Sequence, residues 1–253
     1  MQPLFMELGP VTLYWYGILF SAGFLAAAVH WSFLSRRVGM PPLFGVELCV
    51  WVMISSVVGA RLAYLIANWS QFVDDPLLMV RIDRGGLIFY GGLIGATTAG
   101  IVLARLRAIP IWRMADYAIS AVPLGHAIGR VGCLLNGCCY GAPSTSWWAI
   151  PLDNVLRHPV QVVEATYNLV IYILLMQLYR HKHREGRVFA AYLVLYPAGR
   201  FALEFLRGDQ RLEGLSLNVA QELSLLFIVA GALLWFTLPR KRHHNPRHAH
   251  LPR

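Results

Sequence analysis

Charged residues are scarce in this chain, and acidic residues are the scarcest. Asp, Glu, Lys and Arg make up 14% of the 253 residues, hydrophobic residues make up 57%, and only 13 residues are acidic. Soluble globular domains carry roughly 25% charged residues, so the composition excludes an ordinary soluble domain. The sequence therefore predicts an integral membrane protein.

Internal repeats, low-complexity linkers and long loops are also missing. The segment from Met1 to Pro10 contains no basic residue, so it does not resemble the start of a cleavable signal peptide, and the first apolar run is expected to be a retained span. We therefore expect one polytopic membrane domain over 1–239, followed by a basic tail over 240–253.

Long apolar runs predict the fold. Each is long enough to cross a hydrocarbon core of roughly 30 Å as a helix. They lie at about 11–34, 44–67, 85–104, 117–137, 161–179, 188–206 and 218–239. The sequence thus predicts an all-α integral membrane protein with about seven transmembrane helices. The fourth and sixth runs contain polar residues, and Pro197 lies in the sixth, so a re-entrant segment is an alternative there.

Basic residues predict the orientation of these spans. Of the 22 Lys and Arg residues, 14 follow the first, third, fifth and seventh runs, and 5 follow the others. Because cytoplasmic loops are enriched in Lys and Arg, the amino terminus is expected outside and the carboxyl terminus in the cytoplasm. Most of the basic residues would then lie next to anionic lipid headgroups. The net charge of +9 therefore does not indicate a nucleic-acid partner. The histidines of the tail are expected to be part of this basic end rather than a metal-binding tract.

Three arginines lie within the apolar runs: Arg61, Arg130 and Arg200. A guanidinium at bilayer depth costs several kcal/mol unless it faces a cavity or a partner. Their presence indicates a buried anionic site, and internal ion pairs between helices are the alternative.

The densest polar cluster surrounds Arg130. His126 lies one helical turn before it, and Asn136, Cys133, Cys138 and Cys139 follow. The Cys-x4-Cys-Cys arrangement lacks the Cys-x2-Cys spacing of structural zinc sites, so no metal site is expected. These cysteines are either small hydrophobic residues or, near the outer face, residues open to oxidation.

Two other segments combine polar and helical features. Tyr196, Arg200 and Glu204 are spaced by four and therefore share one helical face, although Arg200 and Glu204 alone would make an ordinary intrahelical ion pair. Gly91 and Gly95 permit close helix approach, while Tyr90 beside them places a phenol in the membrane interior. Glu164 lies about one turn inside the fifth run.

Taken together, these motifs resemble the prolipoprotein diacylglyceryl transferase family over nearly the whole chain. The matching segments occur in the family's order and are Gly9–Gly17, Gly59–Tyr64, Asp75–Leu77, Gly91–Gly95, Gly129–Gly132, Arg157–Gln161, Gly199–Arg207 and Ala220–Ser224. Such collinearity is more specific than any single motif.

The resemblance implies transfer of the diacylglyceryl group of phosphatidylglycerol to the thiol of a lipobox cysteine in bacterial prolipoproteins, with release of glycerol phosphate. It implies a multi-pass protein of the bacterial inner membrane, acting in lipoprotein biosynthesis without a cofactor, and we expect a monomer. Arginine suits this chemistry because its planar fork pairs bidentately with phosphate oxygens.

The resemblance also implies roles for individual residues. Arg130 and Arg200 match the family's important arginines and are expected to hold the phosphate. Tyr196 and Tyr90 complete the expected catalytic set. The expected substrate-binding residues are Tyr16, Arg61, His126, Asn136 and Glu204.

Departures from the family pattern leave the acceptor and the base open. Tyr90 stands where most members have histidine, and Cys133 and Cys138 stand where they have Asn and Glu. An ordinary tyrosine titrates near 10 and is a poor base at neutral pH unless cations favour its phenolate. Two alternatives follow: the same fold acting on a different acceptor, or a non-enzymatic protein that binds or transports phospholipid.

Overall fold

The chain is described here by a computed structural model that covers residues 4–8, 11–41, 43–72, 76–81, 85–152, 154–181, 184–207 and 217–238. The expected basic tail over 240–253 and the matched positions Gly9, Pro10 and Asp75 lie outside the described residues.

Helices make up most of the described chain. They are α1 (Trp15–Val38), α2 (Phe44–Ala67), α3 (Phe89–Leu106), α4 (Ile111–Ile119), α5 (Val122–Asn136), α6 (Val160–Arg180), α7 (Arg187–Glu204) and α8 (Val219–Thr237), with short 3-10 helices η1 (Trp69–Gln71) and η2 (Pro76–Met79). Two antiparallel hairpins accompany them, β1 (Leu4–Leu8) with β2 (Val11–Tyr14), and β3 (Ile150–Leu152) with β4 (Val155–Arg157).

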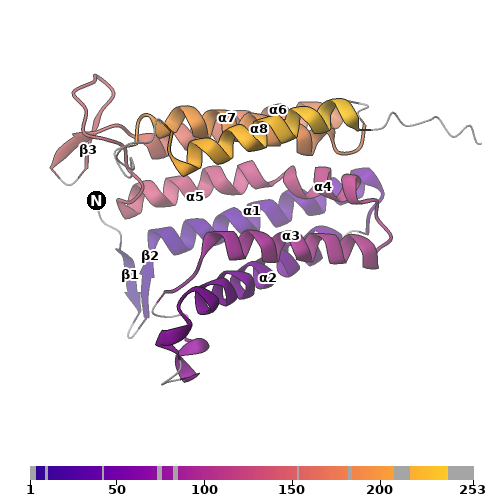
Figure 1. Ribbon diagram of the computed structural model, residues 1–253, viewed down its shortest axis with the longest axis horizontal. Coiled ribbons are helices and arrows are strands. Elements are labelled where there is room, and N and C mark those ends of the chain that lie inside the picture. The colour runs from indigo at the N-terminus through magenta and orange to yellow at the C-terminus, as the bar shows by residue number, and fades with distance from the viewer. Residues whose placement is uncertain are drawn as a thin grey trace, which may run out of the picture.

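The long helices run side by side from one end of the molecule to the other (Figure 1). Contacts between helices give the lateral order α3, α2, α1, α5, α6, α7 and α8. The two hairpins lie at the same end, and α8 finishes at the opposite end (Figure 1). The amino-terminal hairpin and the end of α8 therefore lie at opposite ends, as an odd number of crossings requires.

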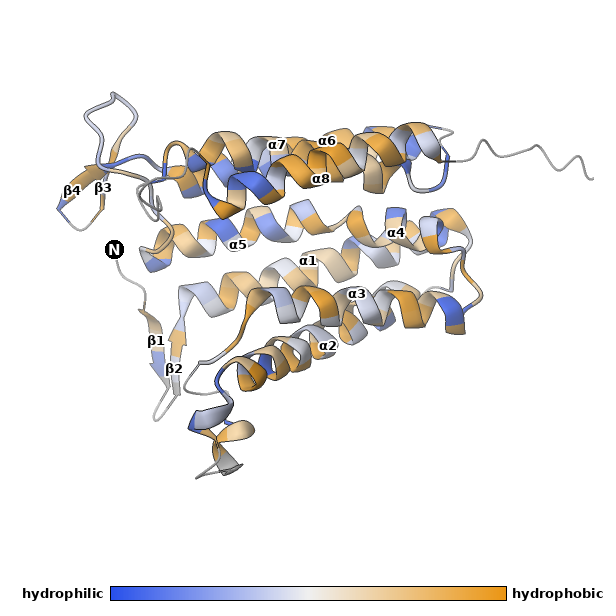
Figure 2. Cartoon of the chain, viewed as in Figure 1, coloured by the Kyte–Doolittle hydropathy of each residue, from blue (hydrophilic) through white to orange (hydrophobic). Residues whose placement is uncertain are grey.

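The helices confirm the all-α membrane class. Hydrophobic residues dominate the long helices (Figure 2), and many large apolar side chains, such as Ile66 and Phe236, are exposed on the outer surface, as a lipid-facing surface requires. In the described chain, six segments are long and apolar enough to span a membrane, with α4 and α5 together forming one of them. The 18-residue α7 is the exception because it contains Arg187, Arg200 and Glu204.

Two predicted boundaries were wrong. The first run was expected to be helical from 11, but Val11–Tyr14 forms β2 and α1 begins at Trp15. The fourth crossing begins at Ile111 rather than 117, and it is two helices. The break falls at Ser120 and Ala121, directly before the Pro123 ring, which supplies no N–H for the helix. Neither α5 nor α7 turns back as a re-entrant segment, since both run along the bundle (Figure 1).

Close approach of α2 and α3 depends on glycine, as the sequence predicted. A Cβ at Gly95 would come within 2.1 Å of the Ser55 carbonyl oxygen, and one at Gly91 within 2.4 Å of the Gly59 carbonyl oxygen. These contacts involve backbone atoms, so the helices would have to separate to admit any side chain.

Buried Asp116 fixes the start of α7. Its carboxylate accepts hydrogen bonds from the backbone N–H of Gly186 at 2.7 Å and of Phe189 at 2.8 Å. Two otherwise unpaired N–H groups at the helix start are thereby satisfied, and the negative charge lies at the positive end of the helix dipole. This contact sets the position of α7, which carries half of the polar cluster described next.

Candidate active site

Polar and charged side chains converge where α5, α6 and α7 come together. His126 and Arg130 project from successive turns of α5, and Tyr196 and Arg200 from successive turns of α7. Between them lies Glu164 of α6, whose side chain is 1% exposed. The sequence singled out the two helical faces, and the structure shows that they point toward a common partner on a third helix.

Arg130 is held by two neighbours. Its Nη2 lies 2.9 Å from Oε1 of Glu164, and its Nε donates to Nε2 of His126 at 3.2 Å. Because His126 accepts through Nε2, the imidazole is neutral in this arrangement and its proton is on Nδ1. The contact of 3.5 Å between His126 Nε2 and Glu164 Oε1 is therefore not an ion pair.

The pair between Arg130 and Glu164 is close but incompletely hydrogen-bonded. Neither carboxylate oxygen of Glu164 receives a well-aligned hydrogen bond from a described residue, although both are buried. No described residue accepts from Nη1 of Arg130. The guanidinium therefore keeps an edge with which it can bind an anion, and the Arg130 side chain is 15% exposed.

Arg200 is paired with a carboxylate on its own helix. Its Nη1 lies 2.7 Å from Oε2 of Glu204, one turn further along α7. Oε1 of Glu204 accepts from Nδ2 of Asn218 at 2.8 Å, and Asn218 also caps the start of α8 with Gln221. Glu204 was expected to bind substrate. In the structure its Oε1 accepts from Asn218, and its Oε2 lies beside Arg200 without a well-aligned hydrogen bond. In this geometry it orients Arg200 and joins α7 to α8.

A glycine allows α6 to pack against α7 beside Arg200. A Cβ at Gly199 would lie 1.9 Å from the ring of Tyr167, which donates its hydroxyl hydrogen to the carbonyl of Leu195. Gly199 thus permits the close contact with α6, and the next residue, Arg200, contributes the charged side chain.

Tyr196 lies between the two arginines. Its ring centroid is 5.3 Å from that of His126 and 5.4 Å from that of Tyr192, with which it stacks. It interacts electrostatically with Glu164, Arg130 and Arg200. The phenol is therefore positioned to donate a hydrogen bond to an anion held by both guanidinium groups.

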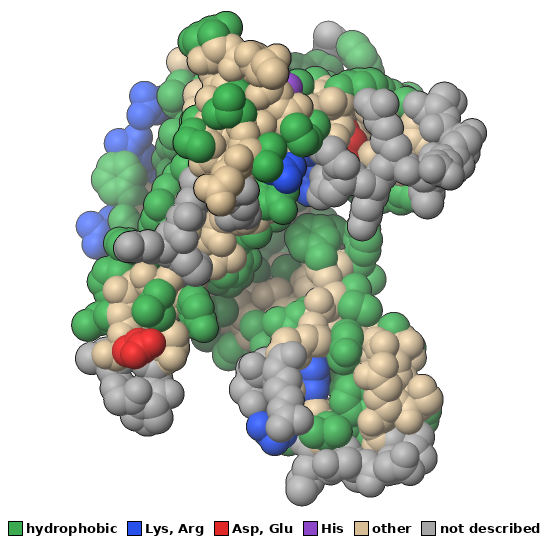
Figure 3. Space-filling model, turned by 90° about the vertical axis from the view of Figure 1, so that its left-hand side faces the viewer, with side chains coloured by type: hydrophobic (Ala, Val, Ile, Leu, Met, Phe, Trp, Pro, Cys, Tyr) green, Lys and Arg blue, Asp and Glu red, His purple; other side chains and the backbone are tan. Residues whose placement is uncertain are grey.

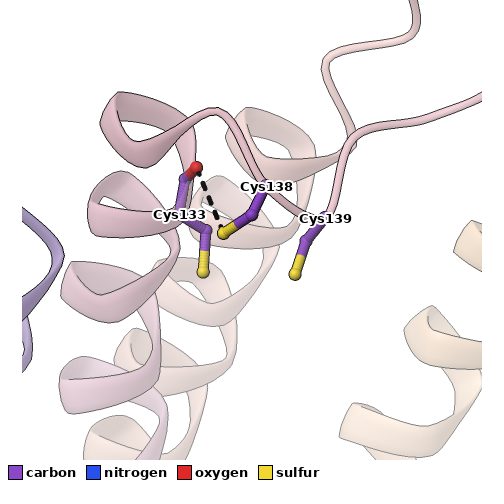
Figure 4. Close-up of side chains that lie close together, drawn as sticks. All are labelled: Cys133, Cys138 and Cys139. Carbon is purple, nitrogen blue, oxygen red and sulfur yellow. Dashed lines mark hydrogen bonds between the residues drawn. The ribbon is translucent and has the colours of Figure 1, made fainter. Parts of the chain in front are cut away.

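Three cysteines and Tyr16 adjoin this cluster. The Sγ atoms of Cys133, Cys138 and Cys139 all lie within 4.8 Å of one another, and their side chains extend into the same space at the end of α5 (Figure 4). Tyr16 of α1 interacts electrostatically with all three and with Arg130. The sequence spacing gave no indication of a compact group of thiols.

The backbone after α5 brings these thiols together. Gly137 ends the helix with φ +71°, and Cys139 also has a positive φ, +59°. For a residue other than glycine, this left-handed conformation is uncommon and requires support from its surroundings. That support includes a hydrogen bond of 2.8 Å from Nε2 of buried Gln161 to the Cys138 carbonyl.

The Cys139 thiol is more acidic than an ordinary thiol. A hydrogen bond from the Cys133 thiol lowers the pKa of Cys139 to about 5, against its partial burial and with help from the positive charges of Arg130 and Arg207. A nucleophilic thiolate is therefore favoured beside the arginine cluster at neutral pH.

Arg61 does not take part in the cluster. Its five N–H groups donate to five backbone carbonyls at 2.5 to 3.0 Å, those of Leu78, Met79, Arg81, Gly85 and Gly86. No donor remains for a phosphate, so the expected substrate-binding role of Arg61 does not fit this structure. The side chain instead holds the segment before α3 against α2.

The remaining expected residues lie at the edge of this arrangement. Tyr90 is 57% exposed near the start of α3 and contacts the ring of Phe89. Among the described residues, no hydrogen bond or ion pair joins it to Arg130 or Arg200. Asn136 is the half-buried last residue of α5.

Two hollows on the surface differ in character. Seen from the end that carries β1 and β2, the molecule has a deep hollow, with basic side chains visible at its upper rim (Figure 3). A separate groove of about 540 Å³ between α2 and α3 is lined by apolar residues such as Trp51 and Ile94, and it includes no member of the polar cluster. The groove is apolar, whereas the polar and charged side chains belong to the α5–α7 cluster.

Glu164 and Gln161 were not among the expected site residues. Both are fully buried on the first turns of α6, although each is polar. The available signal was a carboxylate one turn inside an apolar run, which is costly unless a cation pairs with it.

Comparison with known proteins finds one family over nearly the whole chain. The family profile described as "Prolipoprotein diacylglyceryl transferase" matches residues 3–237. Relatives that bear the name "Phosphatidylglycerol--prolipoprotein diacylglyceryl transferase" align over most of both chains. The protein of Halalkalibacterium halodurans is 35% identical over 245 residues, which cover 92% of this chain and 85% of the relative. That of Geobacillus kaustophilus is 34% identical over 249 residues, with 92% of each chain covered, and that of Clostridioides difficile is 32% identical over 235 residues, with 93% and 94% covered.

Proposed function

The chain belongs to the prolipoprotein diacylglyceryl transferase family, and on that premise we propose that it transfers the diacylglyceryl group of phosphatidylglycerol to the lipobox cysteine thiol of bacterial prolipoproteins, releasing glycerol phosphate. The protein is a multi-pass membrane transferase. The observation that carries the proposal is the pair of guanidinium groups of Arg130 and Arg200, presented from α5 and α7, both of which interact electrostatically with Tyr196.

The two arginines act as a clamp on the phosphate of the lipid. Displacement at the glyceryl carbon expels a phosphate monoester, so negative charge grows on the leaving oxygen in the transition state. Donors already oriented by the protein stabilise such charge most effectively, because they need no reorganisation during the reaction. Glu164 and Glu204 supply that orientation for Arg130 and Arg200.

The counter-charges also explain how two cations persist within the bundle. A buried guanidinium without a partner is strongly unfavourable, and each arginine has one carboxylate near it. Because the hydrogen bonds to Glu164 are poorly aligned, a phosphate can bind Arg130 without breaking an optimal pair. Tyr196 donates a further hydrogen bond to the same phosphate, and His126 fixes the orientation of Arg130 by accepting from its Nε.

The acceptor thiol must lose its proton before it attacks. Neutral His126 is occupied by Arg130, and exposed Tyr90 has no cation bound to it among the described residues. The positive charges of Arg130, Arg200 and Arg207 favour a thiolate near the cluster. Asn136 ends α5, and Tyr16 lies at the start of α1 near the three thiols. The acceptor peptide would approach there, and we assign both residues to its binding.

The orientation of the protein follows from the charges at the two ends of the bundle. Arg36, Arg37, Arg105 and Arg180 lie in the last turns of α1, α3 and α6, at the end away from the hairpins. Cytoplasmic ends of membrane helices are enriched in such residues. We therefore place the hairpins and the cysteine group at the outer face of the bacterial inner membrane, with the carboxyl terminus in the cytoplasm. No nucleic-acid partner is proposed, and a monomer suffices for the site.

A reconstituted assay tests this function. Purified protein in phosphatidylglycerol liposomes is given a lipobox peptide, and glycerol phosphate release and peptide mass are followed together. Both signals are expected, and both should disappear when phosphatidylethanolamine replaces phosphatidylglycerol or when the peptide cysteine is replaced by serine. Release with an unmodified peptide would mean a different acceptor. Lipid binding without release, by folded protein, would mean that the chain is not an enzyme.

A further inference from the structure

Three thiols meet at the mouth of the polar cluster, and the phosphate clamp uses none of them. Cys133 is buried in the last turn of α5, and Cys138 and Cys139 follow in the turn beyond it. In Figure 4 the three side chains lie beside one another, with Cys138 directed toward Cys133, and the Cys138 thiol donates to the Cys133 carbonyl at 3.7 Å. The arrangement uses a left-handed backbone at Cys139, so the third sulfur turns back toward the other two.

The spacing of the sulfurs is close to that of a metal site. Zinc binds thiolate sulfur at about 2.3 Å, so two sulfurs on one tetrahedral zinc ion lie about 3.8 Å apart. Here all three Sγ atoms are within 4.8 Å of one another. Side-chain movements of about 1 Å, available by rotation of cysteine side chains in a turn, would bring them onto one ion.

We propose that Cys133, Cys138 and Cys139 bind one zinc ion through three thiolates, with the fourth coordination position open to the thiol of the acceptor. The acceptor part of this inference rests on the proposed transferase function, whereas the metal site does not. Three protein ligands and one open position are the arrangement of catalytic rather than structural zinc.

The surroundings favour such a site in two ways. Among the described residues, no His, Asp or Glu joins the three cysteines as a fourth ligand, which leaves a position for an external thiol. Three thiolates and one zinc ion carry a net charge of −1, and Arg130 and Arg207 both interact electrostatically with Cys139, so positive charge is available to offset it.

A bound zinc ion would account for deprotonation of the acceptor thiol without a general base from the protein. The acceptor thiol coordinates the ion and loses its proton to water, since thiols bound to zinc are deprotonated outright. The sulfur then attacks the glyceryl carbon of the lipid and forms the C–S bond. The C–O bond to phosphate breaks, its electron pair leaves with glycerol phosphate, and Arg130 and Arg200 hold that product. No oxidant or reductant is required.

Metal analysis tests the site without reference to activity. Full-length protein is reduced, incubated with zinc chloride alone, separated from free metal, and its zinc content measured by mass spectrometry. We expect about one zinc ion per chain in the wild type, and less than about a tenth of that in Cys139→Ser and Cys138→Ser. The matched control is Cys49→Ala, which removes the buried cysteine of α2 outside the group and should keep its zinc. Absence of zinc from reduced wild-type protein, or its retention in both serine variants, would overturn the site.

Cobalt substitution tests the open position. Co²⁺ in the wild-type site should show thiolate-to-metal charge-transfer bands, and a lipobox peptide should change the visible spectrum, whereas the same peptide with serine in place of cysteine should not. An unchanged spectrum would refute acceptor coordination. Transfer by zinc-free protein would refute the acceptor part of the inference and leave the proposed function standing. Zinc binding by folded protein that transfers no diacylglyceryl group would support the metal site and contradict the proposed function.

Discussion

Three arginines within the apolar segments have three different environments. Arg61 gives all its donors to backbone carbonyls, Arg200 is paired along its own helix with Glu204, and Arg130 is paired across helices with Glu164. Nη1 of Arg130 has no hydrogen-bond acceptor among the described residues, and Arg130 also interacts electrostatically with the Cys133 and Cys139 thiols. Arg61 therefore holds the backbone of a neighbouring segment, whereas the role that we propose for Arg130 is chemical.

This difference predicts separate consequences of removing Arg61. Arg61→Ala should lower the free energy of unfolding by about 2–4 kcal/mol, because several carbonyls lose a charged hydrogen-bond donor. Activity per folded molecule should stay close to that of the wild type. The control is Arg107→Ala, which removes an exposed pair with Glu47 and should cost less than about 1 kcal/mol. Unfolding in detergent, followed with increasing denaturant, measures both. A stable but inactive Arg61→Ala protein would contradict a purely structural role and support substrate binding by Arg61.

Neutralising Glu164 should lower the stability of the protein, because the buried Arg130 cation loses its counter-charge. Glu164→Gln keeps the shape but leaves Arg130 unpaired, so stability should fall by about 3–5 kcal/mol. Phosphatidylglycerol should restore more stability to this variant than to the wild type, because its phosphate supplies the missing negative charge. Thermal unfolding with and without the lipid measures the difference, with exposed Glu222→Gln as the control. Equal effects of the lipid on both proteins would contradict phosphate binding at Arg130.

The Cys139 thiol should be reactive in acid. Its pKa of about 5 lies below that of an ordinary thiol, near 8.5, so the thiolate persists above pH 5 and is lost as the pH falls through 5. In metal-free protein, the rate of alkylation by iodoacetamide should change little between pH 8 and 6, and it should fall near pH 5. An ordinary thiol would slow about tenfold per unit over the same range. Cys139→Ser should remove the acid-stable phase, and its persistence in that variant would assign it to another thiol.

Most of these site residues could be predicted from spacing and from the family resemblance, but their partners could not. His126 with Arg130, and Tyr196 with Arg200, share helical faces that are visible in the sequence. Glu164 and Gln161 come from another helix, and no local pattern shows which faces meet. The role of Arg61 depends on carbonyls of an irregular segment, which the sequence does not specify.

At the scale of elements, apolar runs located the membrane helices but not their ends. The run that contains α1 includes β2, because alternating and continuous apolar residues cannot be separated over four positions. Helix α4 was missed because Arg113 and Asp116 interrupt its apolar pattern. Asp116 is buried nevertheless, since it binds the start of α7. Tertiary contacts therefore determine helix boundaries that local hydropathy does not predict.

The crossing of α2 and α3 offers a matched pair of glycine substitutions. Gly95→Ala should destabilise the protein by about 1–3 kcal/mol, because its Cβ would meet the Ser55 carbonyl oxygen at 2.1 Å. Gly100→Ala lies on the same helix with no atom within 4 Å of the added Cβ, so it should stabilise by about 0.5–1 kcal/mol through helix propensity. Unfolding free energies compare the two. Equal effects would show that the helices are not in this close contact.

At the scale of the whole molecule, opposite ends of the bundle have different surroundings. The hairpin of β3 and β4 and the cysteine group lie at one end, and the basic last turns of α1, α3 and α6 at the other (Figure 1). In the proposed orientation, this polarity would give the lipid site access to the outer face, where a secreted precursor would present its thiol.

Labelling of single cysteines tests this orientation. In a variant whose four native cysteines are replaced, Thr145→Cys in the exposed segment before β3 should react with a membrane-impermeant maleimide on intact cells. Exposed Arg36→Cys at the end of α1 should react only after the membrane is opened. The reverse labelling pattern would contradict the proposed topology and indicate the opposite orientation.

The central claim is that Arg130 holds the phosphate of the lipid while the acceptor thiol displaces it. The most direct measurement is the rate of diacylglyceryl transfer by Arg130→Ala in phosphatidylglycerol liposomes, beside the wild type and Arg107→Ala at equal amounts of folded protein. The clamp predicts a loss of at least about 100-fold for Arg130→Ala, as for removal of an oriented donor at a developing anion, and little change for Arg107→Ala. A rate for Arg130→Ala within about threefold of the wild type would contradict the clamp.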